Sequence, residues 1–183
     1  MSALGHALFD TPIGRCGVAW SEAGFTDLLL PGADPSRTRA ALRRRAPQSA
    51  EMPPPPEVHA AIDAVRALLA GHARDLADIV LDLGRVPAFH RRVYEAARRL
   101  GPGQTCTYGE LAEAIGEPAA ARAVGQALGA NPCAVIVPCH RVLATRGASG
   151  GFSAPGGVAT KLRLLEIERA RFGGQPSLFD AGS

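Results

Sequence analysis

Residues 108–128 read YGELAEAIGEPAAARAVGQAL, two helical patterns separated by Gly-Glu-Pro. We predict a first helix over Tyr108–Ile115, a turn at Gly116–Pro118 and a second helix over about Ala119–Leu128. Two short helices joined by a tight glycine-containing turn are typical of a helix-turn-helix, whose second helix contacts DNA, although many such pairs merely pack together. The second helix is rich in alanine and glycine, and Arg122 is its only charge. Its backbone could therefore come close to a nucleic-acid groove.

The sequence pattern changes at about Arg85. From Pro87 onward, helical patterns are separated by Gly-Pro and Gly-Glu-Pro, which indicates a second module. The first helix of this module has an apolar face, made by Phe89, Val93, Ala97 and Leu100. Its arginines lie away from that face, so we interpret it as a core helix with a solvated basic side.

Residues 7–83 carry a mixed pattern of strands and helices. Gly17–Trp20 and Phe25–Leu30 are predicted to be short strands joined by a turn at Glu22–Gly24. A helix is predicted from Glu57, because apolar residues recur there at helical spacing. These residues are Val58, Ile62, Val65 and Leu69.

Three further segments complete this half of the chain. The alternation of Ile79, Leu81 and Leu83 predicts a half-buried strand. The arginine-rich segment Ser36–Arg45 is interpreted as the solvated face of a short helix, with a phosphate-facing patch as the alternative. Pro53–Pro56 is predicted to be a stiff connector.

The C-terminal end combines a loop, a helix and a tail. Gly147–Gly157 is rich in glycine and serine, which favours a loop or wing. A last helix is predicted from about Ala159 to Arg171, with Glu168 near the interior edge. Its core-facing residues are expected to be Leu162, Leu165 and Phe172. Residues 173–183 are expected to form a flexible tail.

These segments predict two domains. Residues 1–85 are expected to form an α/β N-terminal domain with a small sheet plus helix. Residues 86–172 are expected to form a mostly helical C-terminal domain that contains the helix pair and the loop or wing.

Composition limits the class of protein. A chain of 183 residues that is 46% hydrophobic can bury a core, and its apolar runs are too short to span a membrane. Without a recognisable export signal, we expect a cytoplasmic protein whose four cysteines stay reduced. A net charge of +3 permits contact with nucleic acid without requiring it.

The segment Asn131–Val142 carries the chemistry. It reads NPCAVIVPCHRV, an apolar strand-like run that should be buried and should end in a cleft at Pro-Cys-His-Arg. A thiol is a useful nucleophile only as thiolate, so its pKa must be lowered or a base must lie nearby. His140 and Arg141 could each assist Cys139 in this way.

Two other interpretations of this segment exist. Cys139 could be a small buried hydrophobic residue beside a core histidine. A zinc site is the second alternative, but Cys133, Cys139 and His140 lack the usual ligand spacing and no second ligand pair follows. We therefore expect no metal.

The C-terminal half strongly resembles the O6-alkylguanine-DNA alkyltransferases, also called methylated-DNA-protein-cysteine methyltransferases, from about Pro87 to Glu168. The matching motifs are Phe89-x-x-x-Val-Tyr, Gly103-x-x-x-Thr-Tyr-Gly-Glu-Leu-Ala, Ala121-Arg-Ala-Val-Gly-Gln-Ala, Asn131-Pro, Ile136-Val-Pro-Cys-His-Arg-Val and Lys161-x-x-Leu-Leu-x-x-Glu. The N-terminal half agrees more loosely, mainly through Thr11-Pro-Ile-Gly ahead of a strand.

The resemblance implies four catalytic residues. Cys139 would accept the alkyl group, and His140 would act as its base through a bound water. Glu168 would orient and polarise the histidine, which matches the general activation scheme for weak nucleophiles. Tyr108 would donate a hydrogen bond or a proton to the departing guanine.

The resemblance also implies how the substrate is reached. Arg122 would fill the gap that a flipped-out base leaves in the stack. The remaining DNA-facing positions would be Thr107, Ala121, Ala123 and Gly125.

The resemblance assigns further residues to the substrate pocket and its hinge. Asn131 corresponds to the hinge between the DNA-reading helix and the active-site segment, and Ser153 to the serine of the loop over the base. The other pocket positions are Arg141, Val142 and Lys161. The loop from Ser153 to Lys161 is about two residues longer than the common pattern.

Some positions depart from the family. Phe152 stands where tyrosine is frequent, and Ala134 where a proline often lines the alkyl pocket, which leaves the preferred alkyl size open. Some relatives bind zinc in the first domain, but the matching positions here are Ser21 and Thr26. No metal or other cofactor is therefore expected.

The resemblance implies that residues 86–172 form a winged-helix-like, DNA-binding domain. It predicts a suicidal, single-turnover methyltransferase that acts on double-stranded DNA containing O6-alkylguanine, chiefly O6-methylguanine. A monomer without an obligate protein partner is expected. Two alternatives are a non-repairing protein that binds alkylated DNA, against which Cys139 argues, and an unrelated cysteine hydrolase. The hydrolase would leave Tyr108, Arg122 and the helix pair unexplained.

Overall fold

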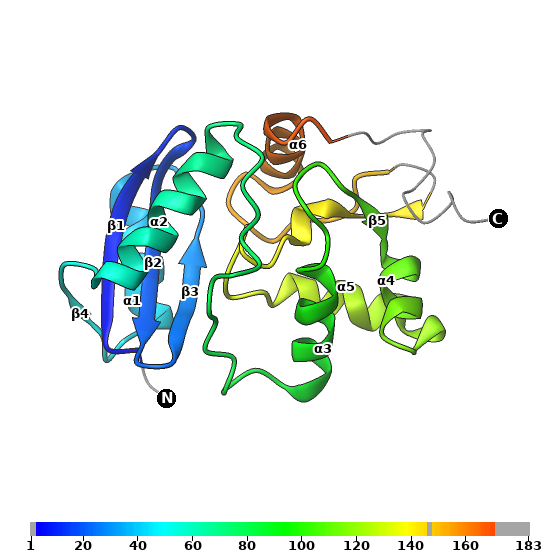
Figure 1. Cartoon of the computed structure of the whole chain (residues 1–183), viewed down its shortest axis with the longest axis horizontal. Helices are drawn as coiled ribbons and strands as arrows, with labels where there is room; N and C mark the ends of the chain where they lie inside the picture. Colours follow the sequence, from blue (N-terminus) through cyan, green and yellow to red (C-terminus); the bar gives the residue numbers. More distant parts are fainter. Residues whose placement is uncertain (1–2, 146–147, 171–183) are drawn as a thin grey trace.

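The computed structural model describes residues 3–145 and 148–170. In Figure 1 the small sheet and the helices that cover it lie at the left of the molecule, and the other helices lie at the right. The two-part layout predicted from the sequence is present. The core position of Phe172, the first residue of the loop from Gly147 and the predicted tail lie outside the described residues.

The sheet has four strands in the order β3-β2-β1-β4. Strands β1 (Gly5–Thr11), β2 (Gly14–Ser21) and β3 (Gly24–Leu29) are antiparallel neighbours, and the short β4 (Ala50–Glu51) pairs in parallel with β1. The two strands predicted from the sequence are therefore confirmed as β2 and β3. Strand β1 was not predicted.

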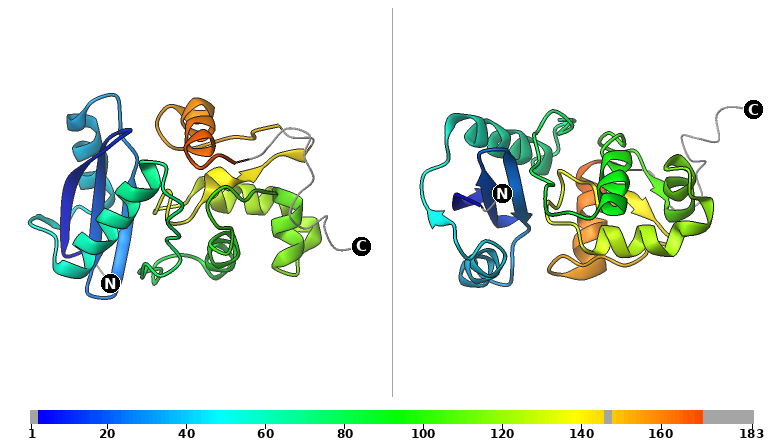
Figure 2. Two further views of the ribbon diagram at one scale, coloured as in Figure 1. Left: turned by 45° about the horizontal axis from the view of Figure 1, so that its top comes forward. Right: turned by 90° about the horizontal axis from the view of Figure 1, so that it is seen from below.

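Helices cover both faces of this sheet. Helix α1 (Pro35–Arg45) packs its Leu42 against Ala19 of β2, whereas α2 (Pro56–Leu69) packs against β1 and joins the main core. Figure 2 (right) shows the sheet between these two helices. The side chains of Val18 and Ala19 point to opposite faces of the sheet because side chains alternate along a strand. One strand can therefore contribute to the core under both helices. The predicted helices at Ser36–Arg45 and from Glu57 are confirmed.

The C-terminal part contains α3 (Ala88–Ala97), α4 (Tyr108–Ala114), α5 (Ala121–Gly129) and α6 (Gly157–Ile167). A single 3₁₀ turn, Pro118–Ala120, precedes α5. Two short parallel strands, β5 (Cys106–Thr107) and β6 (Val142–Leu143), connect α4 to the segment that carries Cys139. The predicted helix pair is confirmed.

Helices α3, α4 and α5 pack on one another and fix the position of α5. Val124, Ala127 and Leu128 are the buried residues of α5, and the buried Tyr94 hydroxyl donates to the Ala127 carbonyl over 2.8 Å. Thr107 caps α4 in a reciprocal capping box with Glu110. The solvent-facing side of α5 is thereby held on a rigid support.

Two sequence predictions of strands are wrong. At Ile79–Leu83 only Leu81 forms an isolated bridge, with Phe25, and the run Cys133–Val137 forms isolated bridges rather than a strand. The second run cannot extend because Val135 has a φ of 72° and the carbonyls of Cys133 and Ala134 accept from Val137 and Ile136. Local turns therefore use the backbone groups that a sheet would need.

The last helix also differs from its prediction. It begins at Gly157 and ends at Ile167, so that Glu168 is its C-cap. Leu165 is buried as expected, but Leu162 is only half-buried, and Leu164 takes the second core position.

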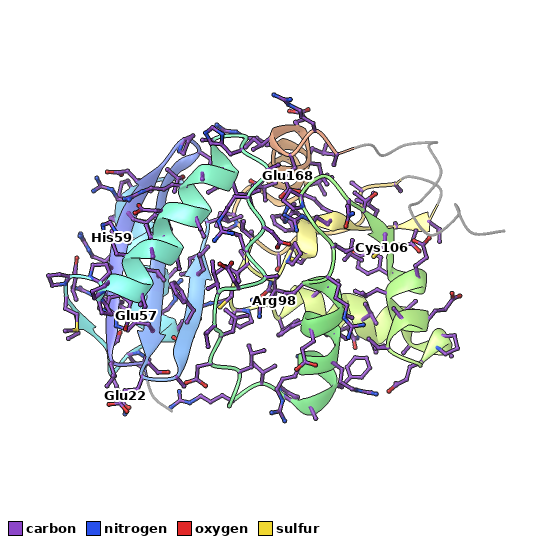
Figure 3. The ribbon with its side chains drawn as sticks, in the orientation of Figure 1. Glu22, Glu57, His59, Arg98, Cys106 and Glu168 are labelled. Carbon is purple, nitrogen blue, oxygen red and sulfur yellow. The ribbon has the colours of Figure 1, made fainter. Side chains whose placement is uncertain are left out.

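Hydrogen bonds to and from the backbone join the two parts of the molecule. The amide of Leu28 in β3 donates to the Pro132 carbonyl over 2.9 Å, and the Ala134 amide donates to the Leu28 carbonyl over 3.1 Å. The guanidinium of Arg98, the C-cap of α3, donates from Nη2 to the carbonyls of Leu76, Ala77 and Ile79. Figure 3 shows Arg98 at this junction. The edge of the sheet thus supports the segment that carries Cys139.

Candidate active site

Cys139 is held at the start of a single 3₁₀ turn, Cys139–Arg141, directly after a tight loop. Asn131 organises this loop: its Nδ2 donates to the Val137 carbonyl (2.9 Å) and to Cys139 Sγ (3.3 Å), and its Oδ1 accepts from the Cys133 amide (2.9 Å). Since Asn131 is buried, these bonds form in a low-dielectric setting. The position of the thiol is therefore fixed by a side chain that follows α5.

The Cys139 thiol is nearly buried, with 7% of the residue exposed. Burial raises the pKa of Cys139, and the hydrogen bond from Asn131 offsets only part of this effect. The resting side chain is thus a neutral thiol at pH 7. A nucleophilic reaction requires a base that removes the proton during the reaction.

A buried charged cluster lies behind the thiol. The Glu168 carboxylate is paired with His140 Nε2 (2.7 Å), and Arg141 donates to it from Nε (2.8 Å) and Nη2 (2.8 Å). The Gly103 amide also donates to Glu168 Oε2 over 3.1 Å, and Arg141 Nη1 donates to the Leu100 carbonyl. Figure 3 shows Glu168 beside α6 and above α3 in this view. All acceptor positions of the carboxylate are therefore used by donors.

These contacts determine the charge state of the pair. Burial acts to raise the pKa of Glu168, but the hydrogen bonds and charges of His140 and Arg141 outweigh it and lower the pKa to about 2. Burial lowers the pKa of His140 from its usual value despite the opposing effect of Glu168. At neutral pH the carboxylate is charged and the imidazole is neutral, with its Nε2 hydrogen directed to Glu168.

The second ring nitrogen of His140 is available. Nδ1 is buried and has no hydrogen-bond partner within residues 3–145 and 148–170. With Nε2 donating, Nδ1 carries a lone pair and can accept a proton. The cluster can therefore function as an oriented base.

The same cluster predicts how stability depends on pH. As the pH falls below about 6.5, unfolded chains bind a proton at His140 more readily than the folded protein. Glu168 contributes stability that is complete above pH 4.5 and is lost as the pH falls toward its folded pKa of about 2. Urea denaturation between pH 8 and pH 3 should show a free energy of unfolding that decreases on acidification. Stability that rises over this range would contradict the assigned charge states.

Lys161 and Tyr108 lie beside one another near the thiol. The ammonium of Lys161 donates to the carbonyls of Val142 (2.6 Å) and Gly151 (3.3 Å) and lies 5.7 Å from the centre of the Tyr108 ring. Burial lowers the pKa of Lys161 to about 8, a shift that the thiolate form of Cys139 opposes. Burial, with a smaller effect of Cys139, raises the pKa of Tyr108, so the phenol is a neutral donor at pH 7.

A cavity of about 460 Å³ opens beside Cys139. Tyr108 and Gly125 form part of its wall, and the other residues around it are Leu128, Gly129, Gly151, Phe152 and Ser153. An added Cβ at Gly125 would lie 3.7 Å from the Tyr108 ring, so the absent side chain leaves this wall open. Gly129, Gly151 and Phe152 were not assigned to the site from the sequence. Phe152 was singled out only as a departure from the family.

The remaining assigned residues lie in three places. Arg122 is exposed on α5, with Ala121 and Ala123 half-buried beside it, and Thr107 is at the N-cap of α4. Asn131 and Ser153 reach the cavities at Cys139. Arg141 and Val142, which were expected to line the substrate pocket, line neither of these cavities. Arg141 instead supports Glu168, and Val142 accepts from Lys161.

The described residues contain no group of three or more histidine, cysteine, aspartate or glutamate side chains that could hold a metal ion. At one of the positions where some relatives place zinc ligands, Ser21 donates to Asp82 over 2.6 Å. Within residues 3–145 and 148–170, no helix has the length and apolar character needed to span a bilayer.

Comparison with known proteins gives the family. A family model described as "6-O-methylguanine DNA methyltransferase, DNA binding domain" matches residues 88–170. The methylated-DNA–protein-cysteine methyltransferase of Mycobacterium tuberculosis is 39% identical over 177 residues, which cover 96% of this chain and 98% of the relative. This chain belongs to the methylated-DNA–protein-cysteine methyltransferase family.

Other relatives extend this relationship. The Methanothermobacter thermautotrophicus protein of the same name is 34% identical over 94% of this chain and 86% of its own length. Among solved structures, the M. tuberculosis OGT in complex with DNA matches with a TM-score of 0.75 at 36% identity, over 93% of this chain and 96% of that one. The family's fold therefore extends across both parts of the chain.

Proposed function

We propose that this protein repairs double-stranded DNA by transferring the alkyl group of O6-alkylguanine, chiefly methyl, irreversibly to Cys139. The observation that carries the proposal is the combination of a buried thiol, held by Asn131, with the His140–Glu168 pair at a cavity beside α5. The membership of the chain in the methyltransferase family supports it.

The chemistry is a displacement at the alkyl carbon. His140 Nδ1 takes the thiol proton through a bound water, and Sγ forms a bond to the carbon as the bond from carbon to O6 breaks. The electron pair left on guanine is stabilised by a proton or hydrogen bond from Tyr108. Glu168 stabilises the imidazolium that forms, as a carboxylate does for an oriented base. The thioether product is not reversed, so each molecule reacts once.

The DNA-binding part of the proposal assigns α4 and α5 to a helix-turn-helix. Residues 86–172 form a winged-helix-like domain in which the loop 148–156 serves as the wing, and residues 1–85 form the N-terminal domain. The small residues of α5 allow close approach to a groove, and Arg122 enters the base stack as the damaged base leaves it. The protein acts as a monomer. Because the acceptor must remain a reduced thiol, we place it in the cytoplasm.

Intact-protein mass tests the proposal. After mixing with excess O6-methylguanine duplex, each native molecule should gain one methyl group, and peptide mapping should place it on Cys139 rather than on Cys16, Cys106 or Cys133. Tight binding without a mass change would establish a lesion-binding protein instead. Turnover of a substrate without stoichiometric modification would establish a hydrolase.

Arg122→Ala should slow transfer from duplex DNA by about tenfold, because flipping a base costs a few kcal/mol and the inserted side chain offsets part of that cost. Transfer from the free O6-methylguanine base, which needs no flipping, should change less than twofold. Time courses of protein mass with both substrates measure this difference. Gln126→Ala, an exposed change on the same helix, is the matched control. An equal loss with duplex and free base would contradict the role of Arg122.

A further inference from the structure

Cys139 lies where two cavities meet. The first is the 460 Å³ cavity beside α5, and the second is a larger cavity of about 790 Å³ between the two parts of the chain. Cys139, Phe152 and Ser153 border both cavities. Figure 2 shows that the loop leading into α6, which carries Phe152, lies on the side of the C-terminal part that faces the sheet. A group bonded to Sγ therefore has space on either side of this loop.

The larger cavity, termed here the interdomain cavity, has an apolar wall and a cationic wall. Ile13, Leu28, Ala134 and Phe152 contribute apolar surface. Arg37, Arg44 and Arg45 of α1 and Arg163 of α6 also border it, whereas no aspartate or glutamate among the described residues does. The position of Ala134 leaves space that a larger side chain would fill. The cavity thus suits a ligand with an apolar stem and a negative end.

Two of these arginines are free to bind an anion. The other two are already paired with carboxylates: Arg45 Nη1 lies 3.4 Å from Asp27 Oδ1, and Arg37 Nε lies 3.7 Å from Asp34 Oδ2. Arg44 and Arg163 form no ion pair with any residue that the structure describes, and both are exposed. One comes from each part of the chain, so they approach the cavity from different sides.

Building on the proposed function, we infer that the interdomain cavity receives the distal part of an extended O6-alkyl group and favours a group with a negatively charged end, such as a carboxylate. In an in-line displacement, Sγ, the reacting carbon and O6 lie along one line, so the rest of the alkyl chain leaves that line sideways. With guanine in the cavity beside α5, the neighbouring interdomain cavity is the space open to the alkyl chain. The bonds made and broken are the same as for methyl, and the charged end does not react.

The test compares four duplexes that differ only in the O6 group: methyl, pentyl, 4-carboxybutyl and 4-aminobutyl. Single-turnover rates are measured by intact mass, and each rate is divided by the methyl rate of the same protein. We expect 4-carboxybutyl to react about fivefold faster than 4-aminobutyl, as suits exposed charges, and salt should reduce the difference. Equal rates for the two charged groups would overturn the inference. Failure of the methyl duplex to react would instead overturn the proposed function.

The variant Arg44→Gln/Arg163→Gln tests the two arginines directly. It should bring the ratio of the carboxybutyl rate to the aminobutyl rate close to one. Arg43→Gln is the matched control, because Arg43 is an exposed residue of α1 that does not border the cavity. The ratio should remain at its native value in this control. If the double variant slows all four duplexes alike, the arginines bind the DNA backbone and the inference is wrong.

Discussion

Cys139→Ser is expected to lower alkyl transfer to less than about one thousandth of the native rate, comparable to the loss of a nucleophile in other enzymes. A serine hydroxyl ionises far less readily than a thiol and is a weaker nucleophile. The fold should persist, since Oγ is smaller than Sγ and can accept the hydrogen bond that Asn131 now donates to Sγ over 3.3 Å. Binding of alkylated duplex should also persist, because the α5 surface is unchanged.

Intact mass after incubation with O6-methylguanine duplex and fluorescence anisotropy with the same duplex measure the two properties. Cys106→Ser is the control: Cys106 is also buried, and burial raises the pKa of its thiol to about 12. The control should accept one methyl group as the native protein does. Methylation of the Cys139→Ser protein at the native rate would show that another residue is the alkyl acceptor and would disprove the assignment.

The helices were predictable because their signals are local. The apolar spacing of Val58, Ile62 and Val65 and the Gly-Glu-Pro punctuation after Ile115 each lie within one element, and the structure has helices at both places. Leu81 and Val135 show where local reasoning fails. Both belong to apolar runs typical of strands, but strand pairing depends on partners distant in the sequence. Leu81 finds only one bridging residue, and the turn at Val135 removes its neighbours from pairing.

The candidate site was predictable in its residues and less so in their contacts. Family motifs located Cys139, His140 and Glu168, and the geometry brings the last two within 2.7 Å. The family resemblance placed Arg141 at the substrate pocket, but a single 3₁₀ turn directs it to Glu168. The interdomain cavity could not be predicted, because it is formed by α1 and the loop before α6, more than a hundred residues apart.

Glu168→Gln is expected to impair both stability and transfer. The native carboxylate, whose side chain is 2% exposed, accepts hydrogen bonds from Arg141 and pairs with His140. Glutamine retains the shape but not the charge, so the buried Arg141 guanidinium loses its counter-ion. Removal of one partner of a buried ion pair costs about 3–5 kcal/mol. For a domain of this size, the melting temperature should fall by about 10 °C.

The effect of Glu168→Gln on transfer has a separate cause. His140 needs an acceptor at Nε2 so that Nδ1 keeps its lone pair, and an amide can present its NH₂ group to the ring instead. Loss of the orienting carboxylate lowers the rate of comparable catalytic groups by up to about 10⁴-fold, and we expect a loss of about 10²- to 10⁴-fold here. Measured well below the melting temperature of the variant, this loss is independent of unfolding.

The control variant is Glu166→Gln. It changes the same residue type at an exposed position of α6 and should alter stability by less than about 0.5 kcal/mol. The stability difference between native protein and Glu168→Gln should also narrow as the pH falls from 4.5 toward 2, because protonation then neutralises the native carboxylate. A folded Glu168→Gln protein that transfers methyl at the native rate would show that His140 does not act as the base, whereas slow transfer with unchanged DNA binding would place the defect in the chemical step.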